Sequence, residues 1–307
     1  MTYALAVHGG AGTILKSSMT PEKEAAYHAG LARALAAGRS VLRDGGPALD
    51  AVTASVCALE DEPLFNAGRG AVFTADGTQE MDAAVMDGAT RRAGAVGGIF
   101  GPRNPVRVAR AVMERTPHVL LIGEGALRVA RDAGLPFEEK DYFLTEDRWD
   151  ALQRTLSMRE RGEEDADPAR RHGTVGAVAR DEAGNLAAAT STGGMTAKAA
   201  GRVGDTPMIG AGTFAENATC AVSGTGHGEV FSRWTAATEI AARMRHLGES
   251  VEAAAEHVVM RDLAPNDGSG GVIAVDGAGR IAMPFNCDGM YRGSVSDTEE
   301  VRTLIYA

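Results

Sequence analysis

A charged segment near the middle of the chain constrains its fold most, because it separates two stretches of regular structure. Residues 157–173, with the sequence SMRERGEEDADPARRHG, hold nine charged side chains in seventeen positions and show no apolar periodicity. A segment of this composition buries too little apolar surface to order itself, so we expect a solvated and mobile linker. The elements before and after the linker therefore have to be predicted separately.

Before the linker, the sequence predicts a strand followed by two helices. Residues 3–7 are apolar and lead into HGGAG at residues 8–12, where glycines allow a close approach of the backbone. Thr20 is a suitable N-cap, and Pro21 suits the first helical position, which predicts a helix as far as Arg43. A second helix is indicated by apolar residues at intervals of three, four and three, at Leu49, Val52, Val56 and Leu59.

The rest of the first half predicts more strands and helices. Asp76-Gly77 is a strong hairpin signal, and its strands would be residues 70–74 and 80–86. Further segments predict strands at 93–99 and 118–122 and helices near 105–115, 123–133 and 146–156.

After the linker, four predicted strands follow one another closely. TVGAVARD and NLAAATST flank an acidic-glycine turn, and MIGAGTF and ATCAVSGTG come next. We expect helices at 228–247 and 250–263, a hairpin around Asp276-Gly277 and a final strand near 301–306. Strands, helices and strands in each half favour an α+β fold with two antiparallel sheets between helical layers.

Composition and charge restrict the class of protein and of partner. The chain has 307 residues, 44% of them hydrophobic, and a net charge of −10, which is typical of a globular protein that binds neither nucleic acid nor an anionic membrane surface. Three scattered cysteines, Cys57, Cys220 and Cys287, give neither a disulfide framework nor a zinc motif. Because we find no signal peptide and no apolar segment long enough to span a bilayer, we expect a cytoplasmic protein.

The end of the linker carries a candidate nucleophile. The linker ends in His172-Gly173, and a cut of the peptide bond between Gly173 and Thr174 would make Thr174 an N-terminal residue. Its α-amine, with an ordinary pKa of about 7.7 to 8, could then take the proton from its own hydroxyl. Gly173 lacks a Cβ and tolerates the strained backbone that such a cut requires. On this dipeptide alone, a strand that simply begins after a loop explains the sequence at least as well.

Hydroxyl and glycine clusters in the second half add to this candidate site. TSTGG (190–194) and SGTGHGE (223–229) each end a predicted strand, where backbone N–H groups can receive a developing negative charge. Each could equally be an ordinary turn. Arg202 and Asp205 lie three residues apart in GRVGDTP and could hold the carboxylate and ammonium of an α-amino acid, although an exposed ion pair is the simpler alternative.

Other classes of protein fit the motifs less well. HGGAG resembles a nucleotide-binding turn but lacks the third glycine of the dinucleotide motif, and no P-loop motif occurs. A nucleotide-binding α/β protein without hydrolase activity nevertheless stays the alternative from a different class. No G-x-S-x-G supports a serine hydrolase. His227 and Glu229 match half of the zinc-deaminase signature, but no P-C-x-x-C accompanies them.

Taken together, several motifs resemble the plant-type L-asparaginases, also called isoaspartyl peptidases, among the N-terminal nucleophile hydrolases. They are HGGAG, LFNAGRGAVFT (64–74), MDAAVMDG (81–88), HGTVGAVARD (172–181), TSTGGM (190–195), GRVGDTP, SGTGHGE and the GSGG…PFN…GMYR tail (268–292). The match keeps the same order over most of the chain. It implies hydrolysis of L-asparagine or of β-aspartyl dipeptides, and an aspartylglucosaminidase-like hydrolase remains the alternative within the superfamily.

The resemblance also implies an architecture. We expect one domain over residues 1–307 with a four-layer αββα sandwich, made as a precursor that cuts itself before Thr174. Residues 1–173 would become an α subunit and residues 174–307 a β subunit, and the pairs would assemble as (αβ)2.

Site roles follow residue by residue from the same resemblance. Thr174 would be nucleophile and base, with Thr192 supporting it and Asn66 orienting its amine. Thr225 and the Gly226 N–H would form the oxyanion hole. The aspartyl part of the substrate would be held by Arg202 at its carboxylate and by Asp205 and the Gly228 carbonyl at its amine, with Thr225 and Gly226 lining the same pocket.

The resemblance implies no catalytic cofactor, but it does imply a structural sodium ion bound by oxygen atoms. Its ligands would be the main-chain carbonyls of Leu59, Glu60, Glu62, Phe65, Ala67 and Arg69. His227 departs from the small or hydroxyl residue that is more usual at its place, which leaves the leaving-group preference open.

Overall fold

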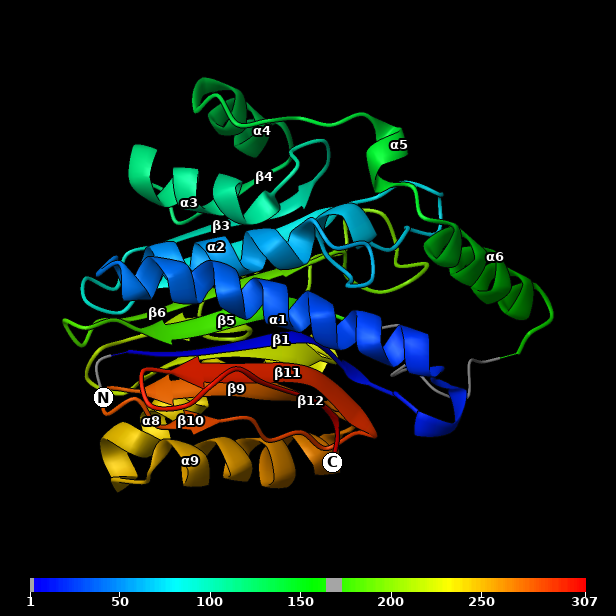
Figure 1. Ribbon diagram of the computed structural model, residues 1–307. Coiled ribbons are helices and arrows are strands. Elements are labelled where there is room, and N and C mark those ends of the chain that lie inside the picture. Colours follow the sequence, from blue (N-terminus) through cyan, green and yellow to red (C-terminus); the bar gives the residue numbers. More distant parts are fainter. Residues whose placement is uncertain (1–2, 164–172) are drawn as a thin grey trace.

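Two β-sheets lie face to face in the middle of the molecule, with helices on their outer faces (Figure 1). The computed structural model describes residues 3–163 and 173–307. In order across the larger sheet, its strands are β12 (Arg302–Tyr306), β11 (Gly289–Ser296), β1 (Ala4–Gly12), β5 (Val175–Arg180), β6 (Leu186–Thr192), β2 (Met81–Asp87), β3 (Ala93–Ile99) and β4 (Leu120–Ile122). The smaller sheet has the order β10 (Ile281–Ala282), β9 (Gly270–Asp276), β8 (Cys220–Gly226) and β7 (Thr213–Ala215).

Helices cover the outer face of each sheet. Four helices pack on the larger sheet: α1 (Pro21–Arg43), α2 (Ala48–Glu60), α3 (Pro105–Arg115) and, at its β3–β4 edge, α4 (Gly123–Asp132). Two helices and a π-helical turn pack on the smaller sheet: α8 (Ala236–Leu247), α9 (Val251–His257) and η4 (Val258–Leu263). The structure also contains α5 (Lys140–Phe143), α6 (Glu146–Glu160), α7 (Gly228–Trp234) and the 3-10 turns η1 (Lys16–Ser18), η2 (Gly68–Gly70) and η5 (Ala264–Asn266).

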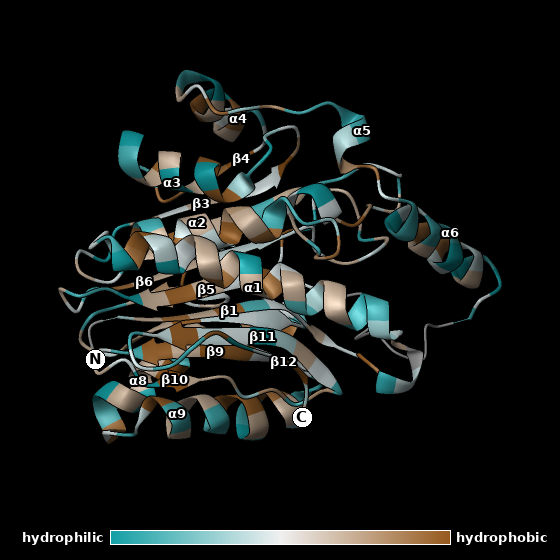
Figure 2. Cartoon of the chain, in the orientation of Figure 1, coloured by the Kyte–Doolittle hydropathy of each residue, from teal (hydrophilic) through white to brown (hydrophobic). Residues whose placement is uncertain are grey.

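The alternation of side chains along the central strands creates two main cores. On β5, Val175, Ala177 and Ala179 face the cluster under α1 and α2, while Val178 faces the cluster between the two sheets. These small side chains allow close packing of the layers, and Figure 2 shows hydrophobic residues gathered in the central strands, with α6 mostly hydrophilic. Because β5 lies between β1 and β6, its first residues are buried at the centre of the larger sheet.

Most of the predicted elements are confirmed, and the helix caps explain why some boundaries were predictable. The first helix runs over Pro21–Arg43 as expected, and the Thr20 hydroxyl accepts the Lys23 backbone N–H at 3.2 Å. The strands at 93–99, β5, β6, β8 and β9, the hairpin around Asp276-Gly277 and the final strand are also present.

The predicted hairpin at 70–86 is wrong. Residues 80–86 do contribute the strand β2, but β2 pairs with β3 and β6, and residues 70–74 form no strand beyond a single bridge at Thr74. The local turn signal at Asp76-Gly77 is satisfied by a turn, and burial of β2 at the centre of the sheet decides its partners.

Other corrections concern boundaries and pairing. Helix α6 continues to Glu160, so the first residues of the expected linker are helical, whereas residues 164–172 of that linker lie outside the described residues. The helix predicted at 228–247 breaks at Thr235, which has a φ of 44°. Strand β11 was not predicted, and β3 pairs with β4 in parallel, so the larger sheet is not purely antiparallel. Among the described residues, no helix is long and apolar enough to cross a membrane.

Candidate active site

Thr174 lies just before β5, where it is 6% exposed and touches the end of β6. Its Oγ1 donates to Thr192 Oγ1 at 3.2 Å, and the Thr192 hydroxyl in turn donates to the carbonyl oxygen of Gly173 at 2.8 Å. The Gly194 backbone N–H donates to the same Thr192 oxygen at 2.9 Å. The Thr192 oxygen therefore accepts two hydrogen bonds and donates one, which fixes the direction of its proton toward Gly173.

Asn66 supplies a second donor to the Gly173 carbonyl. Its Nδ2 lies 2.8 Å from that oxygen and 2.7 Å from the Gly194 carbonyl, while its Oδ1 accepts the Val72 backbone N–H at 3.0 Å. All hydrogen-bonding atoms of this amide are therefore engaged, and its orientation follows from the network. The carbonyl of the Gly173–Thr174 peptide thus receives two donors at 2.8 Å, as an oxyanion-stabilising site does.

The HGGAG sequence forms the end of β1 and lies against the same peptide. A Cβ placed on Gly10, whose φ is +118°, would fall 3.3 Å from Gly173 Cα, so the two backbones are in close contact. One residue further, the Ala11 N–H donates to Thr225 Oγ1 at 3.2 Å. The end of β1 therefore joins the Gly173–Thr174 peptide to the end of β8, where the predicted oxyanion-hole residues Thr225 and Gly226 lie.

The GRVGDTP loop places a charged network close by. Arg202 forms a bidentate ion pair with Glu229, both hydrogen bonds being 2.9 Å long. Arg202 therefore does form an ion pair, as the simpler alternative expected, but its partner is Glu229, whereas Asp205 is buried. A Cβ on Gly194 would lie 3.3 Å from the Arg202 guanidinium, which puts this cation next to the residue that bonds Thr192.

Asp205 is nearly inaccessible, with 5% of its surface exposed, and burial raises its pKa to about 6. Its Oδ2 has no hydrogen-bond partner among the described residues. A Cβ on Gly228 would fall 2.7 Å from Asp205 Oδ1 and 2.9 Å from the Arg202 guanidinium, so only glycine fits between these two groups at the start of α7. A buried carboxylate oxygen without a donor is costly unless a ligand supplies one.

Two further charged residues, Lys198 and Asp82, lie near Arg202. Lys198 donates to the Glu80 carbonyl at 2.8 Å, and burial lowers the pKa of its ammonium. Asp82 accepts the Gly98 N–H at 2.9 Å, and burial raises the pKa of its carboxyl, while the positive charges of Lys198 and Arg202 act in the opposite direction. These groups hold the loop at residues 198–205 against β2.

A small cavity of about 150 Å³ opens beside the Gly173–Thr174 peptide. It is lined by residues 9–14, Tyr27, Leu64, Asn66, Arg148, Gly173 and Tyr291. Arg148 donates here to the carbonyls of Gly70 and Leu64, at 2.9 and 3.2 Å, and so ties α6 to the loop that carries Asn66.

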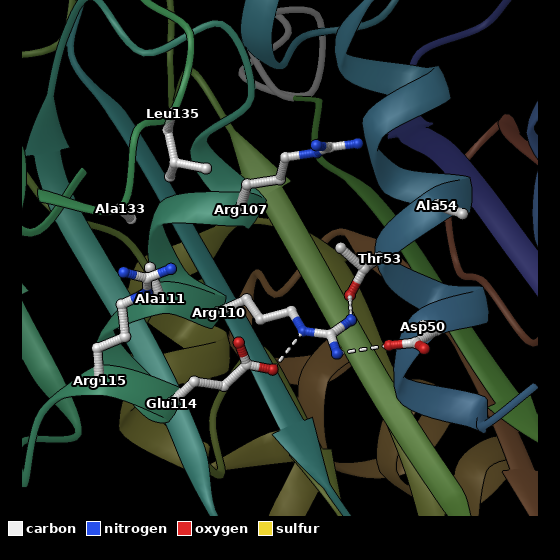
Figure 3. Close-up of a pocket in the computed structure, with 10 residues that line it drawn as sticks. All are labelled: Asp50, Thr53, Ala54, Arg107, Arg110, Ala111, Glu114, Arg115, Ala133 and Leu135. Atoms are coloured by element: carbon white, nitrogen blue, oxygen red, sulfur yellow. Dashed lines mark hydrogen bonds and ion pairs between the residues drawn. The ribbon is translucent and has the colours of Figure 1, made fainter. Parts of the chain in front are cut away.

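A larger pocket of about 320 Å³ lies between α2 and α3 and holds none of the predicted site residues (Figure 3). Arg110 reaches from α3 to Asp50 on α2 at 2.5 Å and also bonds Glu114 at 2.7 Å. The charge of Arg110 is therefore compensated within the pocket.

Comparison with known proteins decides the family. A family model described as "Asparaginase" matches residues 1–305, nearly the whole chain. The chain belongs to this asparaginase family. It is 52% identical over 303 residues to the isoaspartyl peptidase of Salmonella typhimurium, a match that covers 96% of each protein. A protein of Arabidopsis thaliana described as a probable isoaspartyl peptidase/L-asparaginase 2 is 38% identical, and the match covers 99% of each chain.

The structure of this family member brings the predicted residues together, with differences in detail. Thr174, Thr192 and Asn66 meet at the Gly173–Thr174 peptide, and Thr225, with Gly226 after it, is connected to this peptide through the end of β1. His172 lies outside the described residues. His227 sits at the rim, with Nδ1 3.0 Å from the Asp267 carbonyl and Nε2 3.5 Å from Glu229.

Sequence reasoning missed three participants, which are Glu229, Lys198 and His8. Glu229 stands in SGTGHGE, close to two assigned glycines, but nothing local predicts that it pairs with Arg202 at a separation of 27 residues. His8 begins HGGAG, and only the folded chain shows that its ring reaches Thr174 and Ser223.

Proposed function

We propose that this chain is a self-cleaving threonine hydrolase that acts on L-asparagine and on β-aspartyl dipeptides. The observation that carries the proposal is the pair of donors, Asn66 Nδ2 and the Thr192 hydroxyl, aimed at the Gly173 carbonyl next to the Thr174 hydroxyl. The relatives named isoaspartyl peptidase and isoaspartyl peptidase/L-asparaginase support the same activity.

Self-cleavage would begin with attack of Thr174 Oγ1 on the Gly173 carbonyl carbon. The hydrogen bonds run from Thr174 through Thr192 to the Gly173 oxygen, so Thr192 can take the attacking hydroxyl's proton while it passes its own proton to that oxygen. The C–N bond then breaks as the former carbonyl oxygen loses this proton and the leaving nitrogen gains it, so that the C=O bond reforms as part of an ester and the α-amine of Thr174 is released. Water hydrolyses the ester, and the polar cavity beside Gly173 is large enough to admit it.

Turnover would use the new α-amine of Thr174 as the base. The amine takes the Oγ1 proton, and the oxygen attacks the side-chain carbonyl of the substrate. The oxyanion would be held by Thr225 and the Gly226 N–H, the leaving amine or ammonia takes the proton back, and water releases L-aspartate.

Substrate recognition would depend on the buried carboxylate of Asp205. A substrate ammonium would donate to this carboxylate, whose Oδ1 faces Gly228 and whose Oδ2 has no partner among the described residues, with the Gly228 carbonyl as a further acceptor. Arg202 would bind the substrate carboxylate from the pocket where it now holds Glu229.

A structural sodium ion would suit the loop between α2 and η2. Four of its expected ligands, the carbonyls of Leu59, Glu62, Phe65 and Ala67, already accept backbone N–H groups of this tight loop, and a carbonyl oxygen that accepts one hydrogen bond has a second lone pair for a cation. Gly68, with a φ of +52°, packs where a Cβ would fall 2.5 Å from the Glu60 carbonyl. Main-chain oxygens are the donors that a hard cation prefers, and the bound ion would hold Asn66 in place together with Arg148.

The proposal also covers the fold type, the assembly, the partners and the compartment. The two sheets with helices on both outer faces support the four-layer αββα sandwich of the N-terminal nucleophile hydrolases. The mature fragments would assemble as (αβ)2, and small-molecule substrates would be the partners. All three cysteines are free thiols, which fits a reducing compartment such as the cytoplasm.

Substitution of the nucleophile tests the proposal. Thr174→Ala should give a single uncut band on denaturing gels and no release of ammonia from L-asparagine, because both steps lose the attacking oxygen. Thr192→Ala should slow self-cleavage by about 10²- to 10⁴-fold, the usual contribution of a positioned proton-transfer group, whereas Thr192→Ser should retain it. Parental ammonia release by the Thr174→Ala protein would refute the assignment.

A further inference from the structure

His8 is a buried histidine on β1 that has no place in the chemistry above, yet it touches the nucleophile. It is 0% exposed, and its Nδ1 lies 2.9 Å from the carbonyl oxygen of Thr174. Pairing of β1 with β5 ends at His8 opposite Gly176, and pairing of β5 with β6 ends at Val175. Thr174 therefore lies outside the paired part of β5. The imidazole of His8 gives its carbonyl the hydrogen bond that a neighbouring strand would give if the pairing continued.

The partners of the ring decide where its proton sits. A carbonyl oxygen only accepts, so Nδ1 carries the proton that it shares with Thr174. Nε2 lies 2.8 Å from the Ser223 hydroxyl, which then donates to it. Burial lowers the pKa of His8 to about 3, so the ring is neutral near pH 7.

A chain of hydroxyl groups supports this tautomer. Ser223 Oγ lies 2.8 Å from Thr190 Oγ1, and Thr190 Oγ1 lies 2.7 Å from the Thr213 hydroxyl, whose proton also faces the Thr206 carbonyl at 3.0 Å. Since Ser223 gives its proton to His8, it accepts the proton of Thr190. The hydrogen bonds therefore run in one direction from Thr190 on β6 through Ser223 on β8 to the ring and on to the Thr174 carbonyl.

Close packing and two hydrogen bonds restrict the orientation of the His8 ring. A Cβ on Gly176 would collide with both His8 Nε2 and Ser223 Oγ, so the strand facing the ring has to carry glycine there. The ring is held by Ser223 on one side and by the Thr174 carbonyl on the other, which fixes both its tilt and its distance from the nucleophile.

We propose that His8 is a positioning residue, whose Nδ1–H holds the Thr174 carbonyl and so fixes the nucleophile once the peptide bond to Gly173 is cut. The proposal rests on the proposed function. Before the cut, the chain restrains Thr174 from both sides. Afterwards Thr174 is a chain terminus, and the carbonyl hydrogen bond restrains rotation of the residue that carries both Oγ1 and the amine. Because His8 acts through Thr174, its loss should lower kcat and leave KM unchanged.

Two amide substitutions separate this role from simple packing. In His8→Asn the amide nitrogen can stand near the place of Nδ1, whereas in His8→Gln it stands near the place of Nε2. We expect His8→Gln to lower kcat about 10- to 100-fold with unchanged KM, which is the effect of a nucleophile displaced by about 1 Å, and His8→Asn to recover most of the loss. Ser223→Ala is the matched control, with a smaller fall of kcat alone. Parental kcat in His8→Gln, or equal losses in both amide variants, would overturn the proposal.

Nitrogen-15 NMR of histidine-labelled protein tests the geometry without relying on activity or on the folding of His8 variants. The spectrum should show the Nδ1–H tautomer of His8, and the His8 signals should not shift between pH 5 and pH 9. These signals are assigned by their loss in whichever His8 variant folds, or by their coupling to Thr174. The uncut Thr174→Ala protein should give the same tautomer, because the carbonyl remains. A proton on Nε2, or a titration midpoint within this range, contradicts the inference. If Thr174→Ala proves fully active, the proposed function fails while this measurement still decides the tautomer.

Discussion

At the residue scale, the site depends on buried polar atoms whose partners are fixed by counting donors and acceptors. Thr192 accepts from Thr174 and Gly194 and donates to Gly173, so its proton can move in one direction only. Asp205 differs from Thr192, because its Oδ2 has no partner among the described residues. The saturated hydrogen bonds of Thr192 suit a group that orients the nucleophile, whereas the free oxygen of Asp205 suits a group that binds a ligand.

The raised pKa of Asp205, about 6, gives a prediction for substrate binding. Only the carboxylate form pairs with a substrate ammonium, and this form is lost as pH falls through 6. Between pH 7 and pH 5 the ionised fraction falls about tenfold, so KM should rise about tenfold. Steady-state kinetics over this range checks the prediction, with Asp205→Asn as the variant whose high KM should not vary. A parental KM that stays level down to pH 5 would exclude this role.

Some residues of the site could be predicted from the sequence and others could not, for a physical reason. Thr174, Thr192 and Asp205 lie in glycine-rich motifs whose spacing is local and can be recognised. The Arg202–Glu229 pair and the His8–Ser223 contact join side chains 27 and 215 positions apart. Only the fold brings such residues together, so no local pattern could predict these two contacts.

At the element scale, capping and turn chemistry set the ends of elements, whereas burial selects their partners. Thr20 and Pro21 predicted the start of α1 correctly because the cap is a local hydrogen bond. Asp76-Gly77 predicted the wrong partner for β2, since the central position between β3 and β6 buries both faces of that strand. Strand β11 was missed because GMYRGSVS has no clear alternation, although its register along β1 is regular apart from one bulge.

The end of α2 carries a prediction about stability. Glu60 is fully buried, its Oε1 accepts the Val106 N–H at 2.9 Å, and burial raises the pKa of its carboxyl to about 8. The folded chain keeps this proton up to pH 8, while the unfolded chain loses it near pH 4.5, so this group destabilises the fold as pH rises between these values. Glu60→Gln keeps a neutral side chain of the same size. Its Tm should therefore fall less steeply than the parental Tm between pH 6.5 and pH 8, whereas parallel slopes in thermal melts would contradict the assignment.

At the scale of the whole molecule, the two halves of the chain are interleaved. In the larger sheet β5 and β6 come from the second half, and β1 and β2, which flank them, come from the first. A cut before Thr174 removes no strand from the sheet. Native size-exclusion chromatography of the cut protein should show both fragments in one peak that only denaturant separates, and separate elution without denaturant would refute this packing.

The identity of the amino-terminal residue on the active fragment tests the central claim most directly. Purified protein would be incubated until hydrolysis of L-asparagine is constant, and the fragments would be separated and sequenced from their amino ends. The account predicts that one fragment begins with Thr174, followed by Val175 and Gly176, and that its appearance parallels the rise in activity. Full activity in a chain that remains uncut, or in one whose new end is any other residue, would contradict it.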